Sequence, residues 1–137
     1  MLSTVEKTLF LKSIDLFSEI PAEALSEIAQ ISREEFRDAG NEIFAEGEPG
    51  DALYLVLEGR VRVHRESRLI AELGERECFG EMAILDVAPR SATVTALTDL
   101  RLLRIHRSDF QEVMMEKPEV SRGVVRILTR RLRNAIG

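Results

Sequence analysis

Residues 79–94 read FGEMAILDVAPRSATV, and the rest of the chain is best interpreted outward from this stretch. Gly80 lets the backbone approach a ligand closely. Residues 81–85 can form one short helical turn whose free amides and dipole point toward negative charge. Arg90 is a permanent cation with a planar fork of donors and can pair with a phosphate across the loop from those amides. The stretch therefore predicts an anion site with phosphate as its guest.

Glu81 does not suit a plain phosphate site, because a carboxylate repels anions. A carboxylate accepts hydrogen bonds, however, and a ribose 2′-hydroxyl can donate one. Phosphate together with ribose indicates a nucleotide. Taken singly, Glu81 is better explained as a favourable charge in a first helical turn, and Arg90 as a solvated side chain. The prediction depends on the two residues occurring together at this spacing.

The sequence on both sides of this stretch is typical of short strands. After Ile31, apolar runs are broken at short intervals by glycine-containing turn signals, a pattern that indicates an all-β barrel or sandwich. Seven strands are predicted from the sequence, at residues 35–39, 42–46, 52–58, 60–65, 69–73, 91–96 and 100–105.

Helices are predicted at both ends of this β core. Ser3 and Glu6 have capping-box spacing, and Pro21 opens a second helix. Ser108 is predicted to cap a third helix, and Pro118 opens the last one. We expect a single domain, with N-terminal helices in residues 1–31, the β core in residues 32–106 and C-terminal helices in residues 107–137.

Composition narrows the class of protein. The 137 residues, 45% hydrophobic and 31% charged, suit one soluble domain, and no apolar run approaches the length of a membrane span. One cysteine, Cys78, leaves no internal disulfide and favours a cytoplasmic setting. The net charge of −5 argues against broad nucleic-acid binding. The two histidines have no ligand at metal spacing, so no metal site and no catalytic residues are predicted.

The C-terminal helix is the basic part of this acidic chain. Residues 120–137 contain no acidic residue and five arginines. Four of them are predicted to lie on a solvated face, at positions 122, 126, 130 and 133. Arg131 instead falls on the apolar stripe formed by Val120, Val124, Ile127 and Leu128. That position sets it apart from the other arginines.

Residues 79–93 resemble the phosphate-binding cassette of the cyclic-nucleotide-binding domain family, which includes catabolite activator protein, protein kinase A regulatory subunits and nucleotide-gated channels. The family pattern is Phe-Gly-Glu, three mostly apolar positions, a short loop, often Pro, then Arg, a small residue, Ala, and Thr or Ser. This chain follows it without a gap. Residues 50–63 are similar to the family's β-roll, so the resemblance covers roughly residues 15–135.

The resemblance implies an eight-stranded antiparallel β-roll, jelly-roll-like, with N-terminal helices and a C-terminal lid helix. It also implies ligand-binding roles: Glu81 on the ribose 2′-hydroxyl, Arg90 on the cyclic phosphate, Ser91 near phosphate or base, and backbone amides at Gly80, Met82, Ala83 and Ala92. In the family, Thr at the position of Ser91 often accompanies cGMP and Ala accompanies cAMP. Ser leaves both open, and we favour cAMP, with cGMP as the alternative.

In related domains the last helix closes over the base, so Arg131 is predicted to reach the base, against the alternative of a snorkelling side chain. The expected function is a regulatory sensor whose C-terminal helix moves on binding, and not an enzyme. An attached or associated effector is expected, with no DNA-binding module in this chain. The alternative is a scaffold that keeps the fold but uses its basic helix to hold a protein, anionic lipid or nucleic acid. Intact Glu81 and Arg90 disfavour that alternative.

Overall fold

The computed structural model describes residues 1–136, which form two compact units. The β unit comprises Ser32–Ser108, and the helical unit comprises Met1–Ile31 together with the chain from Asp109 onward. Each unit has its own packing and is described by itself. That all 137 residues act as one domain stays a prediction.

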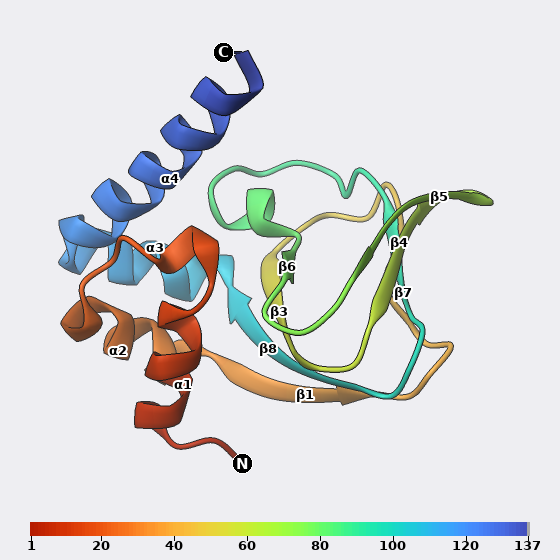
Figure 1. The fold of residues 1–137 in the computed structure, drawn as a ribbon, viewed down its shortest axis with the longest axis horizontal. Coiled ribbons are helices and arrows are strands. Elements are labelled where there is room, and N and C mark those ends of the chain that lie inside the picture. The colour runs from red at the N-terminus through yellow and green to blue at the C-terminus, as the bar shows by residue number, and fades with distance from the viewer. Residues whose placement is uncertain (137) are drawn as a thin grey trace. The chain divides into compact units, whose positions relative to one another are not determined.

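The β unit consists of two four-stranded antiparallel sheets (Figure 1). In the first sheet the order is β1 (Arg33–Arg37), β8 (Leu100–His106), β3 (Ala52–Glu58) and β6 (Cys78–Phe79). In the second sheet it is β2 (Glu42–Phe44), β7 (Thr93–Ala96), β4 (Val61–Arg65) and β5 (Arg68–Leu73). Together they form the eight-stranded roll that the resemblance implies.

The core of the β unit draws side chains from both sheets, because alternate residues of each strand point inward. Three aromatic rings meet there: Phe44 from β2, Tyr54 from β3 and Phe79 from β6. The rings of Tyr54 and Phe79 stack with centroids 5.2 Å apart, and Phe44 lies tilted against both. The remaining buried residues of this core are Ala52, Val56, Val61, Val94, Ala96, Leu100 and Leu102.

The helical unit contains α1 (Thr4–Lys12), the 3₁₀ turn η1 (Asp15–Phe17), α2 (Ala22–Ile31), most of α3 (Arg107–Glu116) and α4 (Pro118–Ile136). The predicted capping box is present, with Ser3 Oγ accepting from the Glu6 amide at 3.1 Å. Gly123 lets α4 approach the segment between η1 and α2, since a Cβ there would lie 2.7 Å from a side-chain carbon of Ile20. No helix within residues 1–136 is long and apolar enough to cross a membrane.

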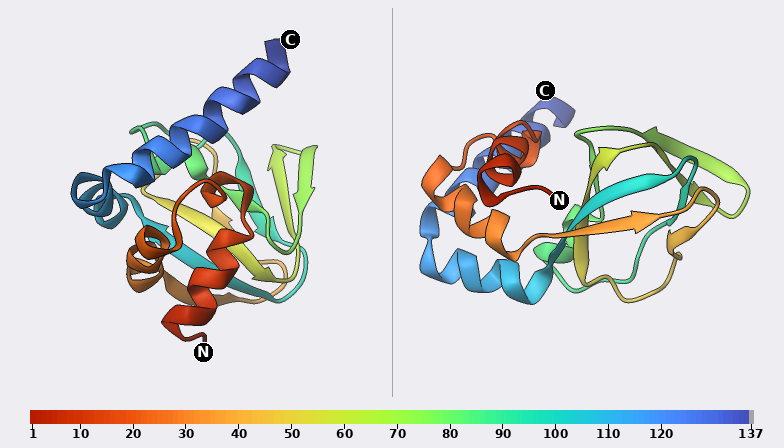
Figure 2. Two further views of the ribbon diagram at one scale, coloured as in Figure 1. Left: turned by 60° about the vertical axis from the view of Figure 1, so that its left-hand side comes forward. Right: turned by 90° about the horizontal axis from the view of Figure 1, so that it is seen from below.

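One half of α4 is packed and the other half is exposed. Its buried residues are Val120, Gly123, Val124 and Ile127. Every residue from Arg130 to Ile136 is exposed, and the helix continues unbroken through this exposed part (Figure 2). The stripe predicted from the sequence is therefore buried only along the first three turns of the helix.

All seven strands predicted from the sequence are present, with ends shifted by one or two residues. The eighth, β6, has only two residues, too few for an alternating pattern to show. The third helix begins at Arg107, so Ser108 lies in its first turn and is not its cap. Instead, Nδ1 of His106 lies 3.3 Å from the amide nitrogen of Ser108 and accepts its hydrogen.

Candidate functional site

A cavity of about 390 Å³ lies in the β unit beside residues 79–94. One wall is apolar and comes from Phe44, Val63, Phe79 and Val94. The other consists of residues 80–83 and 88–92. All the ligand-binding residues predicted within the cassette border this one cavity, namely Gly80, Glu81, Met82, Ala83, Arg90, Ser91 and Ala92.

Arg90 is the buried cation of the cavity. Its side chain enters the β unit, where Nη2 donates to the Ala52 carbonyl at 2.9 Å and the guanidinium carbon lies 3.9 Å from the centroid of the Phe44 ring. The residue is only 8% exposed, and burial lowers its pKa. The nearby side chains of Tyr54, Asp51 and Glu48 oppose that shift, so the group stays cationic.

The Nε–H of Arg90 is buried and has no hydrogen-bond partner. Leaving such a donor unsatisfied costs about 1–3 kcal/mol, and more for a charged group. Since Arg90 lines the cavity, an anion entering it would lie beside the guanidinium that carries this unsatisfied donor. The arrangement is that of an anion site.

Gly80 makes room for this guanidinium. Its φ of +75° is a conformation that L side chains rarely adopt. A Cβ at this position would lie 2.6 Å from Arg90 Nη1 and 3.1 Å from the Ala52 carbonyl oxygen. A residue larger than glycine would therefore displace the cation.

The helical turn predicted after Gly80 is the 3₁₀ helix η2 (Glu81–Ile84). The amide of Ala83 donates to the Gly80 carbonyl at 3.1 Å, and the amides before it stand at the start of the turn, where the helix itself offers no acceptor. Glu81 opens the turn, is half-buried and lines the cavity. Acidic and basic side chains thus border one space, as a nucleotide requires.

Residues 47–50, which the sequence indicated only as a turn, form backbone hydrogen bonds with residues 88–90 of the cassette. The amide of Gly47 donates to the Arg90 carbonyl at 2.8 Å, and the amide of Arg90 donates to the Glu48 carbonyl at 2.7 Å. The amide of Gly50 donates to the Ala88 carbonyl at 3.3 Å. This short antiparallel ladder fixes the backbone from which Arg90 projects.

Ser91 and Ala92 follow Arg90 along the cavity wall. The Ser91 side chain is exposed, and its carbonyl accepts from Arg65 Nε at 2.7 Å. Ala92 is buried. Together with Val63 and Val94, Ala92 gives this part of the cavity an apolar lining.

Arg131 belongs to the helical unit. Its Nη2 donates to Asp15 Oδ2 at 3.0 Å, and neighbouring Arg130 pairs with Glu19 at 3.1 Å. The lining of the cavity does not include Arg131. Its contact with a ligand stays a prediction. Among residues 1–136 no group of three or more His, Cys, Asp or Glu side chains is placed to hold a metal ion.

Comparison with known proteins agrees with this geometry. The family described as cyclic nucleotide-binding domain matches residues 34–117. The chain belongs to this family. Its two-sheet fold is that of a cyclic nucleotide-binding domain, and the family is one of regulatory and not catalytic domains.

The curated relatives include a transcriptional regulator and a cyclic AMP receptor protein. The CRP-like cAMP-activated global transcriptional regulator of Mycobacterium tuberculosis is 36% identical over 99 residues, covering 69% of this chain and 44% of that protein. The cyclic AMP receptor protein of Thermus thermophilus is 42% identical over 101 residues, covering 70% of this chain and 47% of that protein. The chain thus spans less than half the length of these two relatives.

Among solved structures, the N-terminal domain of a transcriptional regulator from Streptomyces coelicolor superposes with a TM-score of 0.85 at 37% sequence identity. The match covers 92% of both chains. Here, unlike with the curated relatives, the similarity extends over nearly the whole of each chain.

Proposed function

We propose that this cyclic nucleotide-binding domain binds cAMP in the cavity beside residues 79–94 and acts as a regulatory sensor without catalytic activity of its own. The observation that carries the proposal is the buried guanidinium of Arg90, which has an unpaired Nε–H and belongs to a residue that borders the same cavity as Glu81. A ligand that presents both an anion and a hydroxyl group satisfies both side chains.

In this proposal the cyclic phosphate accepts from Arg90 Nε and from the backbone amides at Gly80, Met82, Ala83 and Ala92. Glu81 accepts from the ribose 2′-hydroxyl. A cyclic phosphodiester carries a single negative charge, and one buried guanidinium matches it. A terminal phosphate monoester carries up to two negative charges, and the second would be left uncompensated inside the protein.

The base is proposed to lie against the apolar wall of Phe44, Val63 and Val94. The only side chains with polar groups in the described lining are Glu81, Arg90 and Ser91, and the first two are assigned to sugar and phosphate. Guanine has more edge groups that need partners than adenine, so this wall disfavours it. The two bacterial relatives described above have cAMP or cyclic AMP in their names, whereas a protein kinase relative from Caenorhabditis elegans has cGMP.

The proposed output is a change in the position of α4. Its exposed half is tied down by the ion pairs of Arg130 with Glu19 and Arg131 with Asp15, and exposed pairs contribute little, about 0–1 kcal/mol each. A ligand that binds one position of the helix better than another shifts the population between them. An effector segment, joined or associated, would respond to that shift.

The structure gives little support to the alternative of a scaffold that binds a partner through its basic C-terminal helix. Three of the five arginines of α4 are already paired with carboxylates, those of Glu119, Glu19 and Asp15. The basic face is therefore partly neutralised within the helical unit.

Titration calorimetry with cAMP, cGMP and the open-ring 5′-AMP tests the proposal. We expect cAMP to bind most tightly and 5′-AMP least. A melting experiment supplies a second readout, since cAMP at 100 times its Kd should add about 2.7 kcal/mol of stability. Absence of binding by both cyclic nucleotides would refute nucleotide sensing and leave the scaffold, and tighter binding of cGMP would reverse the assignment of the base.

A further inference from the structure

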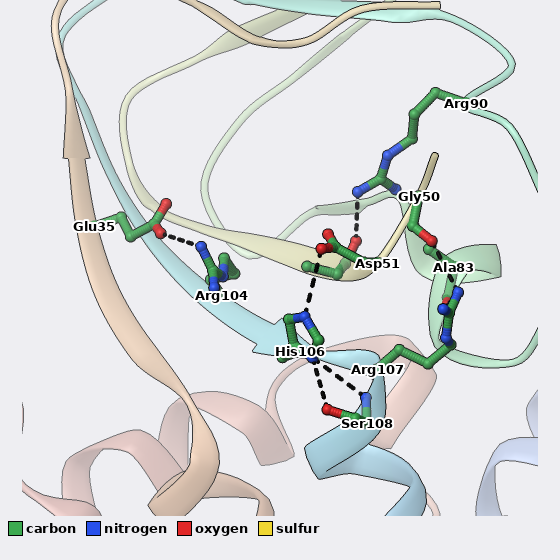
Figure 3. A network of polar contacts seen from close by, with 10 residues as sticks. Glu35, Gly50, Asp51, Ala83, Arg90, Arg104, His106, Arg107 and Ser108 are labelled. Carbon is green, nitrogen blue, oxygen red and sulfur yellow. Dashed lines mark hydrogen bonds and ion pairs between the residues drawn. The ribbon is translucent and has the colours of Figure 1, made fainter. Parts of the chain in front are cut away.

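The three consecutive carbonyls of residues 50–52 accept hydrogen bonds from two arginines, the first two from Arg107 and the third from Arg90. The Gly50 carbonyl accepts from Nη1 of Arg107 at 2.9 Å, and the Asp51 carbonyl accepts from the backbone amide of Arg107 at 2.8 Å. The next carbonyl, of Ala52, accepts from Nη2 of Arg90. Figure 3 shows Arg107 and Arg90 approaching this segment. One short piece of backbone thus connects the start of α3 to the cation of the cavity.

Arg107 also reaches the cassette. The same Nη1 lies 3.4 Å from the carbonyl oxygen of Ala83, in η2. Arg107 therefore bridges the two segments that enclose the guanidinium of Arg90: residues 50–52 and the turn that follows Gly80.

There is little space between these segments. A Cβ built on Gly50 would lie 3.2 Å from the Ala83 Cβ and from the Cδ and Nε of Arg90. A displacement of Gly50 by a few tenths of an ångström would accordingly move the Arg90 stem or the turn beside it. Close-packed interiors transmit such displacements because they contain few voids.

A second side chain, that of His106, contacts residues 50–52. His106 Nε2 lies 3.4 Å from Asp51 Oδ2, while its Nδ1 faces the Oγ of Ser108 at 2.9 Å (Figure 3). His106 and Arg107 are adjacent, so the end of β8 fixes residues 50–52 by two side chains and one backbone amide. The His106 and Asp51 side chains are substantially exposed, and Arg107, which is part-buried, is the stronger of the two ties.

We propose that Arg107 is a positioning residue for nucleotide binding. By holding the carbonyls of Gly50 and Ala83, it fixes the carbonyl of Ala52 and, through it, the direction of the Arg90 guanidinium beside the cavity. Arg107 itself is not part of the cavity lining, so it acts through Arg90 and not on the ligand. This inference rests on the proposed function.

A double-mutant cycle tests this dependence. The Kd for cAMP is measured for the wild type, Arg107→Ala, Arg90→Lys and the double variant, with Arg90→Lys chosen to keep binding measurable. We expect Arg107→Ala to weaken binding about tenfold with Arg90 present, and less than about twofold when Arg90 is already lysine. Equal losses in both backgrounds, or no loss in either, would overturn the inference.

Arg101→Ala is the matched control. Arg101 lies on β8, the strand that leads into Arg107, and likewise donates to two partners, Glu58 and Glu34, outside the cavity. We expect it to leave the Kd unchanged, and a loss equal to that of Arg107→Ala would show that any loosening of β8 has the same effect. Arg107→Lys keeps the charge and a donor group, and we expect it to recover most of the affinity. All variants are first melted to establish that they fold.

A readout without nucleotide separates this inference from the proposed function. The side-chain Nε–H resonance of Arg90 is recorded by NMR in the ligand-free protein. We expect Arg107→Ala to shift it and Arg101→Ala to leave it in place. If the wild type binds no cyclic nucleotide, the proposed function fails, yet the shift still shows that Arg107 positions Arg90. An unchanged resonance overturns the inference even if nucleotide binds.

Discussion

Arg90 in the β unit and Arg131 in the helical unit have the same side chain in opposite surroundings. Arg90 is 8% exposed and keeps a buried donor without a partner. The Arg131 side chain is 41% exposed and shares an ion pair with a more exposed carboxylate, that of Asp15. A buried unpaired donor carries a cost that a ligand removes, whereas an exposed pair exchanges readily with water. Binding energy is therefore expected to concentrate at Arg90, and any conformational response at Arg131.

The largest effect should come from Arg90→Ala. We expect cAMP binding to weaken by roughly 2–5 kcal/mol, because the phosphate would lose its counter-charge in a desolvated site. Calorimetry measures the change, with Arg101→Ala as the control for loss of an arginine outside the cavity. A loss below tenfold would contradict the role of Arg90 and remove the contrast with Arg131.

A smaller loss is expected for Glu81→Ala. Removing a hydrogen bond between a hydroxyl and a carboxylate should cost about 1.5–3 kcal/mol of binding. The sharper measurement uses 2′-deoxy-cAMP. The wild type should prefer cAMP over the deoxy analogue by this amount, and the Glu81→Ala variant should bind both alike. An unaltered preference in the variant would assign the sugar contact elsewhere.

Gly80→Ala should affect binding and stability together. The positive φ alone costs about 1–2 kcal/mol for a residue with a side chain, and the new methyl group also meets Arg90 Nη1. Gly40→Ala is the matched control, since Gly40 has φ +89° but nothing within 4 Å of a Cβ. We expect both variants to melt earlier and only Gly80→Ala to lose affinity for cAMP. Equal affinities would mean that Arg90 accommodates the methyl group.

The smallest effect belongs to Arg131. Arg131→Ala should change the free energy of unfolding by less than about 1 kcal/mol, because the pair with Asp15 is exposed. If Arg131 leaves Asp15 to contact the base, the variant should weaken cAMP binding a few-fold, and Asp15→Ala should strengthen it slightly by freeing the arginine. Unchanged affinity in both variants would show that Arg131 stays with Asp15 throughout.

Sequence reasoning located the cavity residues that are close together in the chain, and their ligand-binding roles stay predictions. Residues 80–83 and 90–92 border one cavity as their spacing indicates, because a single turn and a short loop leave the backbone few alternatives. It missed Phe44 and Val63, which strand pairing brings to the cavity from elsewhere in the chain. The hydrogen bond from Arg107 to the Gly50 carbonyl was missed for the same reason, since the two residues are 57 positions apart in sequence.

The boundaries that were missed also have physical causes. Cys78 and Phe79 pair with β3 over two residues, so the strand β6 has no periodicity to detect. The third helix begins before Ser108 because the ring of His106 accepts the first free amide, a role that sequence patterns assign to Ser, Thr, Asp or Asn.

The ring of Phe44 is at once a wall of the cavity and the surface on which the Arg90 guanidinium rests. Fit to the ligand's shape and fit to its charge are therefore not independent in this protein. Anyone who reshapes the cavity to accept a bulkier analogue by trimming Phe44 would also loosen the cation that holds the anion. Val63 and Val94 offer the safer positions, since they border the same space without supporting a charge.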